Sequence, residues 1–320
     1  MKGGYVSIAL MVLAGVLGVL ILLEISLRLL FGFGNPLLYV ADPQIGYLLA
    51  PNQRTRRFGN QLLINQYSMR SAEIMPTRPD RVVRVLLLGD SIANGGWWTD
   101  QSDTISAVLQ RQLKLDITGI ERVEVLNASA SSWGPRNELA YLQRFGSFES
   151  QVIILLINTD DLFATAPTSI KVGHDRNYPD QKPPLALIEV VSRYLAKPDS
   201  GAEVEPVQRE QGDRVELNLV AIRQIQDIAR KSEAKFVLVM TPLLREIGEP
   251  GPRNYEKEAR TRLQAMVRQH QIPFIDFLPV FGKVADPQTL YRDNIHLSRE
   301  GNHQVTRSIA KAVERILSSE

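Results

Sequence analysis

The stretch Arg84-Val-Leu-Leu-Leu-Gly-Asp-Ser91 (RVLLLGDS) decides the fold class of this chain. A run of branched apolar residues is typical of a strand that is buried on both faces of a parallel sheet. The run ends in Gly89-Asp90-Ser91, so a serine hydroxyl is expected just beyond the carboxyl end of that strand. Open α/β sheets bind their ligands at this edge. The stretch therefore predicts a candidate nucleophile at the binding edge of a sheet.

The residues after Ser91 alternate between apolar strands and amphipathic helices. Strands are predicted at 123–126, 152–157, 235–240 and 274–277, and helices at 104–115, 136–145, 217–231, 255–270 and 303–317. Such alternation indicates a parallel sheet with helices on both sides. We therefore expect a flavodoxin-like three-layer α/β/α sandwich.

A second motif, Asp293-Asn-Ile-His296, directly precedes the last predicted helix. A serine hydroxyl is a weak nucleophile and needs a base that accepts its proton. His296 suits that role, since an imidazole has two distinct nitrogens and exchanges protons near neutral pH. Asp293 is then expected to hold the productive tautomer of the ring. A capping serine, a turn aspartate and a surface histidine are the alternative, but the joint pattern favours catalysis.

The two motifs together resemble those of the SGNH (GDSL-type) hydrolase superfamily, over residues 80 to 320. Gly-Asp-Ser after an apolar strand is the first block of that superfamily, and Asp-x-x-His before the last helix is its final block. The resemblance implies the SGNH hydrolase fold and an ester-cleaving mechanism. In that mechanism Ser91 is the nucleophile, His296 the general base and Asp293 the orienting carboxylate.

The resemblance also implies an oxyanion hole, which the two middle blocks supply in altered form. The superfamily uses the backbone amides of the serine and of a second-block glycine, together with a third-block asparagine side chain. Here Ser91 keeps its amide, Ser132 replaces the glycine, and Asp160 replaces the asparagine. An ionised carboxylate accepts hydrogen bonds and donates none. A working hole therefore needs a protonated Asp160, or a donor from Asn158 or Thr159.

The three tryptophans, Trp97, Trp98 and Trp133, all follow the first two blocks. On the predicted fold they belong to loops at the active edge, where indole faces stack well on sugar rings. Ordinary loop packing is the alternative reading. An exposed aromatic rim would also suit a lipid substrate.

Residues 1–33 are predicted to form a transmembrane signal anchor. No residue from Gly3 to Leu23 is charged, and this run is long enough to cross a bilayer as a helix. A cleaved signal peptide is the alternative, but no good small-x-small cleavage site follows the run. Lys2 and the terminal amine, set against Arg28 and Glu24, favour a cytoplasmic N-terminus and an extracytoplasmic domain.

Residues 34–80 are predicted to form a connecting extension that packs on the main domain, which spans residues 81–320. The pattern Asp42-Pro-Gln-Ile-Gly-Tyr47, followed by Asn65-Gln-Tyr-Ser-Met-Arg70, resembles the stretch before the hydrolase domain of membrane-anchored SGNH proteins. Those proteins are often linked to envelope polysaccharide. The resemblance thus implies envelope polysaccharide machinery as a partner.

Residues 164–213 interrupt the alternation of strands and helices with a proline-rich, partly polar insertion. A long segment with few core-forming residues is expected to be a lid, a partner surface or a mobile loop. A short amphipathic helix is expected between Pro183 and Leu195.

The composition excludes several classes of site. The chain has no cysteine, which rules out disulfides, thiolate nucleophiles and zinc–thiolate centres. A net charge of +2 does not indicate a nucleic-acid-binding surface. The four histidines show no spacing typical of metal ligands, apart from His296 and His303, which lie two helical turns apart. We therefore expect neither a metal site nor a cofactor.

The sequence therefore predicts a membrane-anchored serine esterase or O-acyltransferase that acts on acyl esters, in particular acetyl esters, of a cell-envelope glycan. Hydrolysis and transfer share the same acyl-enzyme, so the residues leave both open. One alternative is a catalytically weak SGNH-like binding or assembly module in polysaccharide export. Another is a lipid or thioester hydrolase.

Overall fold

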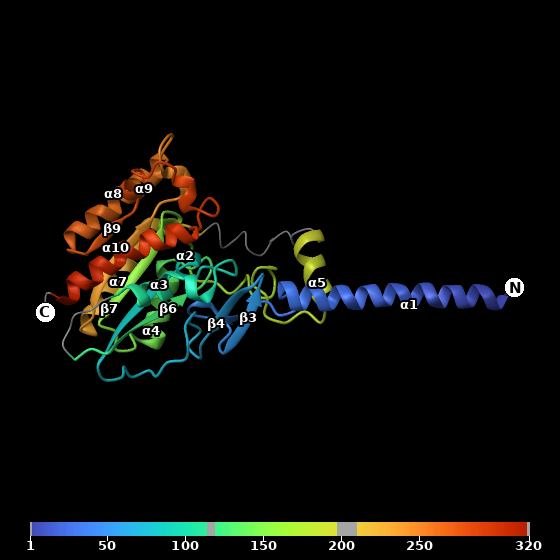
Figure 1. Ribbon diagram of the computed structural model, residues 1–320. Coiled ribbons are helices and arrows are strands. Elements are labelled where there is room, and N and C mark those ends of the chain that lie inside the picture. Colours follow the sequence, from blue (N-terminus) through green and yellow to red (C-terminus); the bar gives the residue numbers. More distant parts are fainter. Residues whose placement is uncertain (1, 114–118, 197–209, 319–320) are drawn as a thin grey trace.

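The computed structural model describes residues 2–113, 119–196 and 210–318 of the chain. Within these ranges the chain forms a layered α/β domain, and a long helix projects from that domain (Figure 1). Residues 197–209 of the predicted insertion and the end of the helix predicted at 104–115 lie outside the described residues.

The central sheet has strand β5 at its switch point. Five parallel strands are ordered β6-β5-β7-β8-β9, which is the flavodoxin-like order. Their bounds are β5 Val82–Gly89, β6 Arg122–Ser129, β7 Val152–Asn158, β8 Lys235–Thr241 and β9 Phe274–Asp276. All eight residues of β5 are buried, because helices cover both faces of the sheet.

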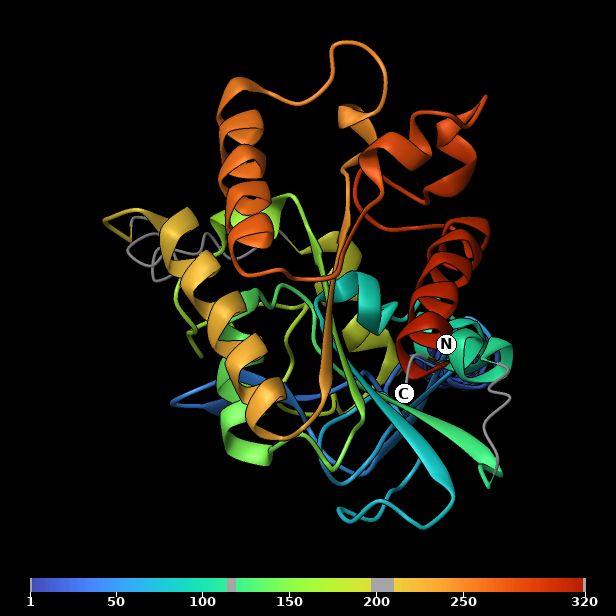
Figure 2. The same ribbon diagram turned by 90° about the vertical axis from the view of Figure 1, so that its left-hand side faces the viewer.

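Successive β5 side chains enter opposite apolar layers, as the period of a strand requires. Leu86 and Leu88 belong to the cluster that includes α4 and α7, whereas Val85 and Leu87 belong to the cluster that includes α3 and α10. Figure 2 shows the two helical layers on either side of the sheet. The helices are α3 Ile105–Gln112, α4 Pro135–Phe145, α7 Arg214–Lys231, α8 Asn254–Gln269 and α10 Arg299–Ser318. The predicted three-layer sandwich is confirmed.

Short elements connect these layers, mostly at the carboxyl ends of the strands. They are α2 Ser91–Asn94, η2 Gln101–Asp103, η3 Asp160–Phe163, η5 Leu244–Glu246, α9 Leu278–Phe281 and η6 Pro287–Leu290. Among them α2 begins directly after β5, so its first residue, Ser91, lies at the binding edge of the sheet.

The N-terminal extension forms two antiparallel hairpins. Strands β1 Tyr39–Asp42 and β2 Gly46–Leu49 form the first, and β3 Gln53–Arg57 and β4 Asn60–Ile64 form the second. The first hairpin packs on α4, where the Asn137 side chain donates to the Ile45 carbonyl over 2.8 Å. Tyr47 and Leu49 share one apolar cluster with the sheet. The extension therefore completes the core of the domain.

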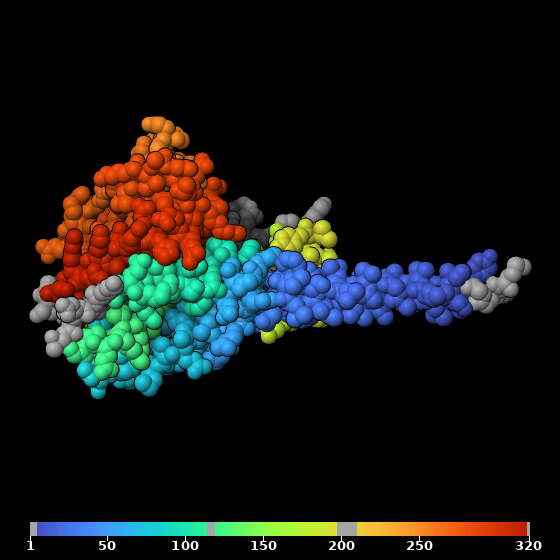
Figure 3. Space-filling view, in the orientation of Figure 1, coloured from blue at the N-terminus to red at the C-terminus, as the bar shows by residue number. Residues whose placement is uncertain are grey.

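A single long helix precedes the extension. Helix α1 (Lys2–Ser26) continues into η1 (Leu27–Phe31), and Figure 3 shows it extending away from the body of the molecule. Residues Tyr5–Phe31 are long and apolar enough to cross a membrane, and their most apolar part makes no buried contact within the protein. A signal sequence passes the same test of length and composition.

The described part of the insertion contains the short helix that the sequence predicts. Helix α5 (Ala186–Val190) continues directly into η4 (Val191–Leu195) and lies against the inner end of α1 (Figure 1).

Arg70 of the extension fixes the loop that follows α2. The guanidinium is buried and donates to the carbonyls of Asn94, Gly96 and Thr99, with 2.6 Å to the Gly96 oxygen. Desolvation by burial lowers the pKa of Arg70 to about 10, so the side chain stays charged at neutral pH. The loop thus bound carries Trp97.

Replacement of Arg70 by methionine tests this clamp. The variant keeps the volume of the side chain but leaves three buried carbonyl groups without their donor. We expect Arg70→Met to lower the free energy of unfolding by about 2–4 kcal/mol in urea denaturation. The matched control is Arg54→Met, which alters an exposed arginine of β3. Equal stabilities of the two variants would contradict the proposed clamp.

Candidate active site

Ser91 is held at a sharp strand-to-helix turn. The Asp90 carboxylate caps α2 by accepting from the Ile92 amide over 2.8 Å, which shapes the turn. Gly89 has no room for a side chain, because a Cβ there would lie 2.8 Å from the Leu156 carbonyl oxygen. The Gly-Asp-Ser sequence therefore has a local physical explanation at each of its three positions.

His296 connects Ser91 with Asp293. Its Nε2 lies 3.0 Å from Ser91 Oγ, and its Nδ1 lies 2.8 Å from Asp293 Oδ2. The Asp293 carboxylate also accepts from the His296 amide over 2.9 Å, which fixes the spacing of the motif. These are the distances and the order of contacts that nucleophile, base and orienting carboxylate require.

Asp293 is held in its ionised form by the hydrogen bonds that its carboxylate accepts. Desolvation raises the pKa of its carboxyl, but the hydrogen bonds from the amides of His296 and Ile295 and from the imidazole outweigh that effect. The net shift lowers the pKa of Asp293. The carboxylate can thus accept a hydrogen bond from Nδ1–H of His296 and stabilise an imidazolium.

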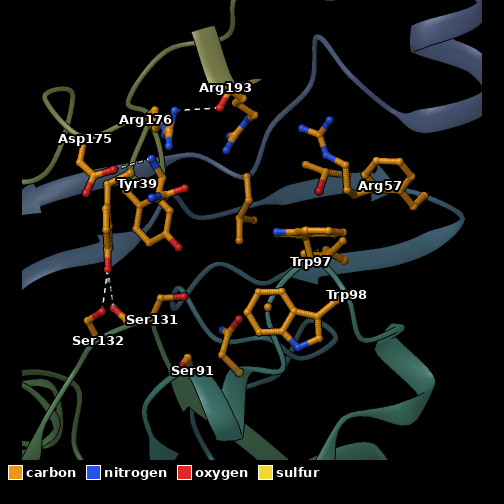
Figure 4. A pocket seen from close by; sticks show the side chains of 18 of the residues that line it. Tyr39, Arg57, Ser91, Trp97, Trp98, Ser131, Ser132, Asp175, Arg176 and Arg193 are labelled. Carbon is orange, nitrogen blue, oxygen red and sulfur yellow. Dashed lines mark hydrogen bonds between the residues drawn. The ribbon is translucent and has the colours of Figure 1, made fainter. Parts of the chain in front are cut away.

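A cleft of about 700 Å³ opens above Ser91 (Figure 4). Three segments far apart in the sequence form its walls: the N-terminal extension, the loop after α2, and the insertion. About half of the lining side chains are aromatic or basic, among them Phe33, Tyr39, Arg57, Phe58, Trp97, Trp98, Lys171, Arg176, Tyr178, Arg193 and Tyr194. The cleft therefore suits a substrate with apolar and with anionic or hydroxylated parts.

Two of the three tryptophans that were predicted to contact substrate lie at the site, namely Trp97 and Trp98. Trp98 packs edge-on against the His296 ring at 4.6 Å between centroids, and Trp97 contacts Trp98 at 5.7 Å. Trp97 is 39% exposed on the cleft wall. Arg292 lies over both indoles, 4.6 Å from the Trp98 centroid. The contact with Trp98 thus restricts the position of the His296 ring.

The prediction that Trp133 offers an indole face to substrate is wrong. Its side chain is only 1% exposed and packs against Tyr141 at 5.6 Å, while its ring nitrogen donates to the Tyr47 carbonyl over 3.0 Å. The β1–β2 hairpin covers this tryptophan, and nothing local to Trp133 in the sequence indicates that cover.

Ser132 occupies a position that favours glycine. Its φ of 59° is in the left-handed region, which explains why a glycine is expected in this block. The turn is held by two tyrosines: the Tyr47 hydroxyl donates to the Ser131 carbonyl over 2.6 Å, and the Tyr178 hydroxyl donates to Ser132 Oγ over 2.8 Å. Sequence reasoning missed both tyrosines, since one lies in the extension and the other in the insertion.

Asn158 and Thr159 do not direct free donors at Ser91. The Asn158 side-chain nitrogen donates to Asp90 Oδ2 over 2.9 Å and to Asp161 Oδ2 over 3.0 Å. The Thr159 hydroxyl donates to Glu246 Oε2 over 2.6 Å. Both side chains are thus engaged in buried contacts, which corrects the expectation that either of them replaces the missing asparagine.

The side chain of Asp160 is exposed at the edge of a second, smaller hollow that also includes Ser91. Desolvation raises the pKa of Asp160, and the neighbouring Glu256 and Glu246 add to this against the opposing charge of Arg245. The shift favours the protonated form, in which a carboxyl has a proton to donate.

Three buried carboxyl groups lie close enough to influence one another. Burial raises the pKa values of Asp90, Asp161 and Glu138, and the proximity of Asp90 and Glu138 raises the pKa of Asp161 further. Neither carboxylate oxygen of Glu138 has a hydrogen-bond partner among the described residues. Such a group stays neutral, because an isolated buried charge is costly.

The fold and the Ser91–His296–Asp293 geometry are those of a serine hydrolase. The model of the GDSL-like lipase/acylhydrolase family matches residues 87–304, and the chain therefore belongs to that family. No curated protein matches the chain.

Several solved structures resemble this protein, with low sequence identity. An acetyl xylan esterase has 14% identity and a TM-score of 0.48, with 72% of this chain and 100% of that chain covered. A lipase/acylhydrolase from Enterococcus faecalis has 14% identity and a TM-score of 0.41, with coverage of 72% and 95%. A catalytic mutant of an acetylxylan esterase from Geobacillus stearothermophilus has 12% identity and a TM-score of 0.44, with coverage of 72% and 93%.

The buried Glu138 predicts an unusual pH dependence of stability. A carboxyl whose pKa is higher in the folded than in the unfolded state destabilises the fold as the pH rises above the unfolded value of about 4.3. Glu138→Gln removes this titration. Between about pH 5 and about pH 8 the free energy of unfolding of the variant should therefore fall less than that of the wild type.

Urea denaturation across this pH range measures the difference. The exposed Glu258 on α8 provides the control Glu258→Gln, which should follow the wild-type curve. If the Glu138→Gln curve also runs parallel to that of the wild type, Glu138 is not the buried neutral acid described above.

Proposed function

We propose that this protein is a membrane-anchored serine esterase or O-acyltransferase that acts on acyl esters of a cell-envelope glycan through a covalent acyl-enzyme. The observation that carries the proposal is the continuous contact from Ser91 Oγ through His296 to Asp293 at the floor of an open cleft. Membership of an acylhydrolase family supports the ester-cleaving step. We also propose an anchor at 1–33, an extension at 34–80 and a hydrolase domain at 81–320.

In the first half-reaction Ser91 Oγ attacks the ester carbonyl carbon and gives its proton to His296 Nε2. Asp293 accepts the Nδ1 hydrogen bond and stabilises the imidazolium that forms. The tetrahedral intermediate collapses with cleavage of the ester C–O bond, and the departing alkoxide takes the proton from Nε2. The acyl group is then bound to Ser91, and the alcohol leaves the cleft.

In the second half-reaction an acceptor hydroxyl gives its proton to His296 Nε2 and attacks the acyl carbon. The bond from that carbon to Ser91 Oγ then breaks, and Ser91 Oγ takes the proton back from Nε2. Water as the acceptor releases the acid, whereas a sugar hydroxyl yields a new ester. Aromatic side chains in the cleft, such as Trp97, give a sugar ring a surface on which to stack. They support a glycan as donor or acceptor.

Two backbone amides are the proposed oxyanion donors. Neither the Ser91 nor the Ser132 amide has a hydrogen-bond acceptor within the part of the chain that the structure describes, and both residues line the cleft. The third donor is proposed to be the Asp160 carboxyl in its protonated form. Each well-placed donor contributes about 10²–10³-fold to the rate of such reactions.

A binding or assembly module is the second candidate. It is favoured by the carboxyl group of Asp160 at the position of the third donor, and by the engagement of the Asn158 amide with Asp90 and Asp161. A site with two donors would bind an ester and turn it over slowly.

Covalent labelling separates the two candidates. The proposed enzyme reacts with a fluorophosphonate probe at Ser91, and Ser91→Ala abolishes both the labelling and the hydrolysis of 4-nitrophenyl acetate. His296→Asn should lower the turnover number by about 10³-fold or more, because the proton acceptor is lost. His303→Asn, on helix α10, is the matched control and should keep wild-type activity. A folded wild-type protein that neither labels nor hydrolyses the ester would rule out the enzyme.

Asp160→Asn tests the third donor. An asparagine amide donates at every pH, so the variant should hydrolyse 4-nitrophenyl acetate faster than the wild type above neutral pH, by up to about tenfold. The pH profile of kcat distinguishes this from an unspecific effect, since the gain should shrink as the pH falls and Asp160 becomes protonated. A variant with wild-type activity at all pH values would show that position 160 does not contact the oxyanion.

A further inference from the structure

The helix formed by α5 and η4 (186–195, the insertion helix) has an apolar outer face. Ile188, Val191 and Leu195, spaced three and four residues apart, are 46%, 50% and 76% exposed. Leu185, just before the helix, and Tyr194 are exposed as well. A stripe of this kind on a soluble surface is unusual and marks a contact with an apolar partner.

The two charged residues of the insertion helix point toward the protein. Glu189 is buried, accepts from the Gly34 amide over 2.6 Å and pairs with Arg57 and with Arg193, the latter over 2.9 Å. Arg193 and Tyr194 line the cleft. The helix is therefore polar toward the domain and apolar toward the outside, the reverse of a helix that covers a soluble core.

The helix is bound to α1 at the level where the uncharged run of α1 ends. Glu24 accepts from the amides of Ala186 and Leu187 over 2.8 and 2.9 Å, and Arg28 donates to the Pro184 carbonyl over 3.1 Å. Glu24 directly follows the uncharged run that ends at Leu23. When α1 spans a bilayer, this level is the boundary between hydrocarbon and headgroups.

The orientation of the insertion helix agrees with this position. Figure 1 shows it lying across the inner end of α1 rather than along it, and Figure 3 shows its atoms packed against α1 outside the body of the domain. A helix that crosses a membrane-spanning helix in this way lies in the plane of the bilayer. Helices in this plane bury an apolar face at the boundary between headgroups and acyl chains.

We propose that the insertion helix is a second membrane contact, and that its partner is the lipid bilayer itself. The proposal rests on the proposed function in one respect, namely that α1 spans the membrane. The insertion helix then forms the wall between the lipid and the cleft, a thickness of about 10 Å. The cleft consequently receives esters that are carried by membrane-resident amphiphiles, such as a lipid-linked glycan.

A chain of aromatic contacts supports this route from the membrane to the nucleophile. Phe31, at the end of the apolar helix, contacts Phe58 at 5.7 Å, and Phe58 contacts Trp97 at 5.4 Å. Trp97 contacts Trp98, which packs on His296. An apolar chain that leaves the bilayer beside α1 thus meets rings along its path to the active site.

Site-directed fluorescence tests the membrane contact. The chain contains no cysteine, so a single introduced cysteine carries the only label. We place an environment-sensitive nitrobenzoxadiazole dye at Val191→Cys, at Leu17→Cys in α1 and at Lys257→Cys on α8, in the full chain reconstituted into phosphatidylcholine–phosphatidylglycerol vesicles. Lipids with a spin label near the headgroup act as quenchers.

The proposal predicts blue-shifted, quenched emission at position 191 and unquenched emission at position 257. Emission at 191 that matches 257, while the label at 17 is protected inside the bilayer, would overturn the second contact and leave the anchor intact. A solvent-exposed label at position 17 would instead contradict the membrane anchor, and with it the premise of the proposal.

Activity measurements test the delivery of substrate. Ile188, which is 46% exposed, lies on the outer face and does not line the cleft. Ile188→Asp therefore places a charge on that face and leaves the cleft unaltered. We expect kcat/KM for a long-chain 4-nitrophenyl ester embedded in vesicles to fall about tenfold, from the loss of apolar burial. Hydrolysis of water-soluble 4-nitrophenyl acetate should stay at the wild-type rate. Equal effects on the two esters would contradict a role in delivery from the membrane.

Discussion

The hydrogen bond between His296 Nε2 and Ser91 Oγ, 3.0 Å long, joins residues 205 positions apart, and much of the fold serves to hold it. Strand β5 places Ser91 at the edge of the sheet. The apolar residues of the strand are buried in two layers, and this burial fixes where the strand ends. Asp293 holds His296 through both its ring and its amide. The indole of Trp98 then restricts the ring from another side. A rigid sheet and two local contacts thus produce a reactive geometry.

The cleft above this bond is formed by the N-terminal extension, the loop after α2 and the insertion. Arg70, from the extension, fixes the loop that carries Trp97, and Tyr178, from the insertion, fixes the turn at Ser132. The buried Glu189 connects the extension with the insertion helix by its pairing with Arg57. Because the insertion helix is bound to α1 in turn, the geometry of the cleft is coupled to the position of α1.

The sequence predicted the fold, and it singled out the three residues that the structure brings into contact at the cleft, since both depend on local patterns. Continuous apolar runs identify the buried strands, apolar residues with a period of 3.6 identify the helices, and Gly-Asp-Ser and Asp-x-x-His lie at element ends. The cover over Trp133 and the clamp at Arg70 escaped prediction, because each depends on a contact between segments distant in the chain. The engagement of Asn158 escaped prediction for the same reason. Its side-chain nitrogen donates a hydrogen bond to Asp90, which follows a different strand of the sheet.

The proposed mechanism depends most on Ser91 carrying an acyl group during turnover. Mass spectrometry of the intact protein, quenched in acid shortly after mixing with 4-nitrophenyl acetate and followed by peptide mapping, tests this directly. We expect a mass increase of one acetyl group, located on the peptide that contains Ser91 and absent in Ser91→Ala. Hydrolysis of the ester with no acylated protein, or with the acetyl group on another residue, would contradict it.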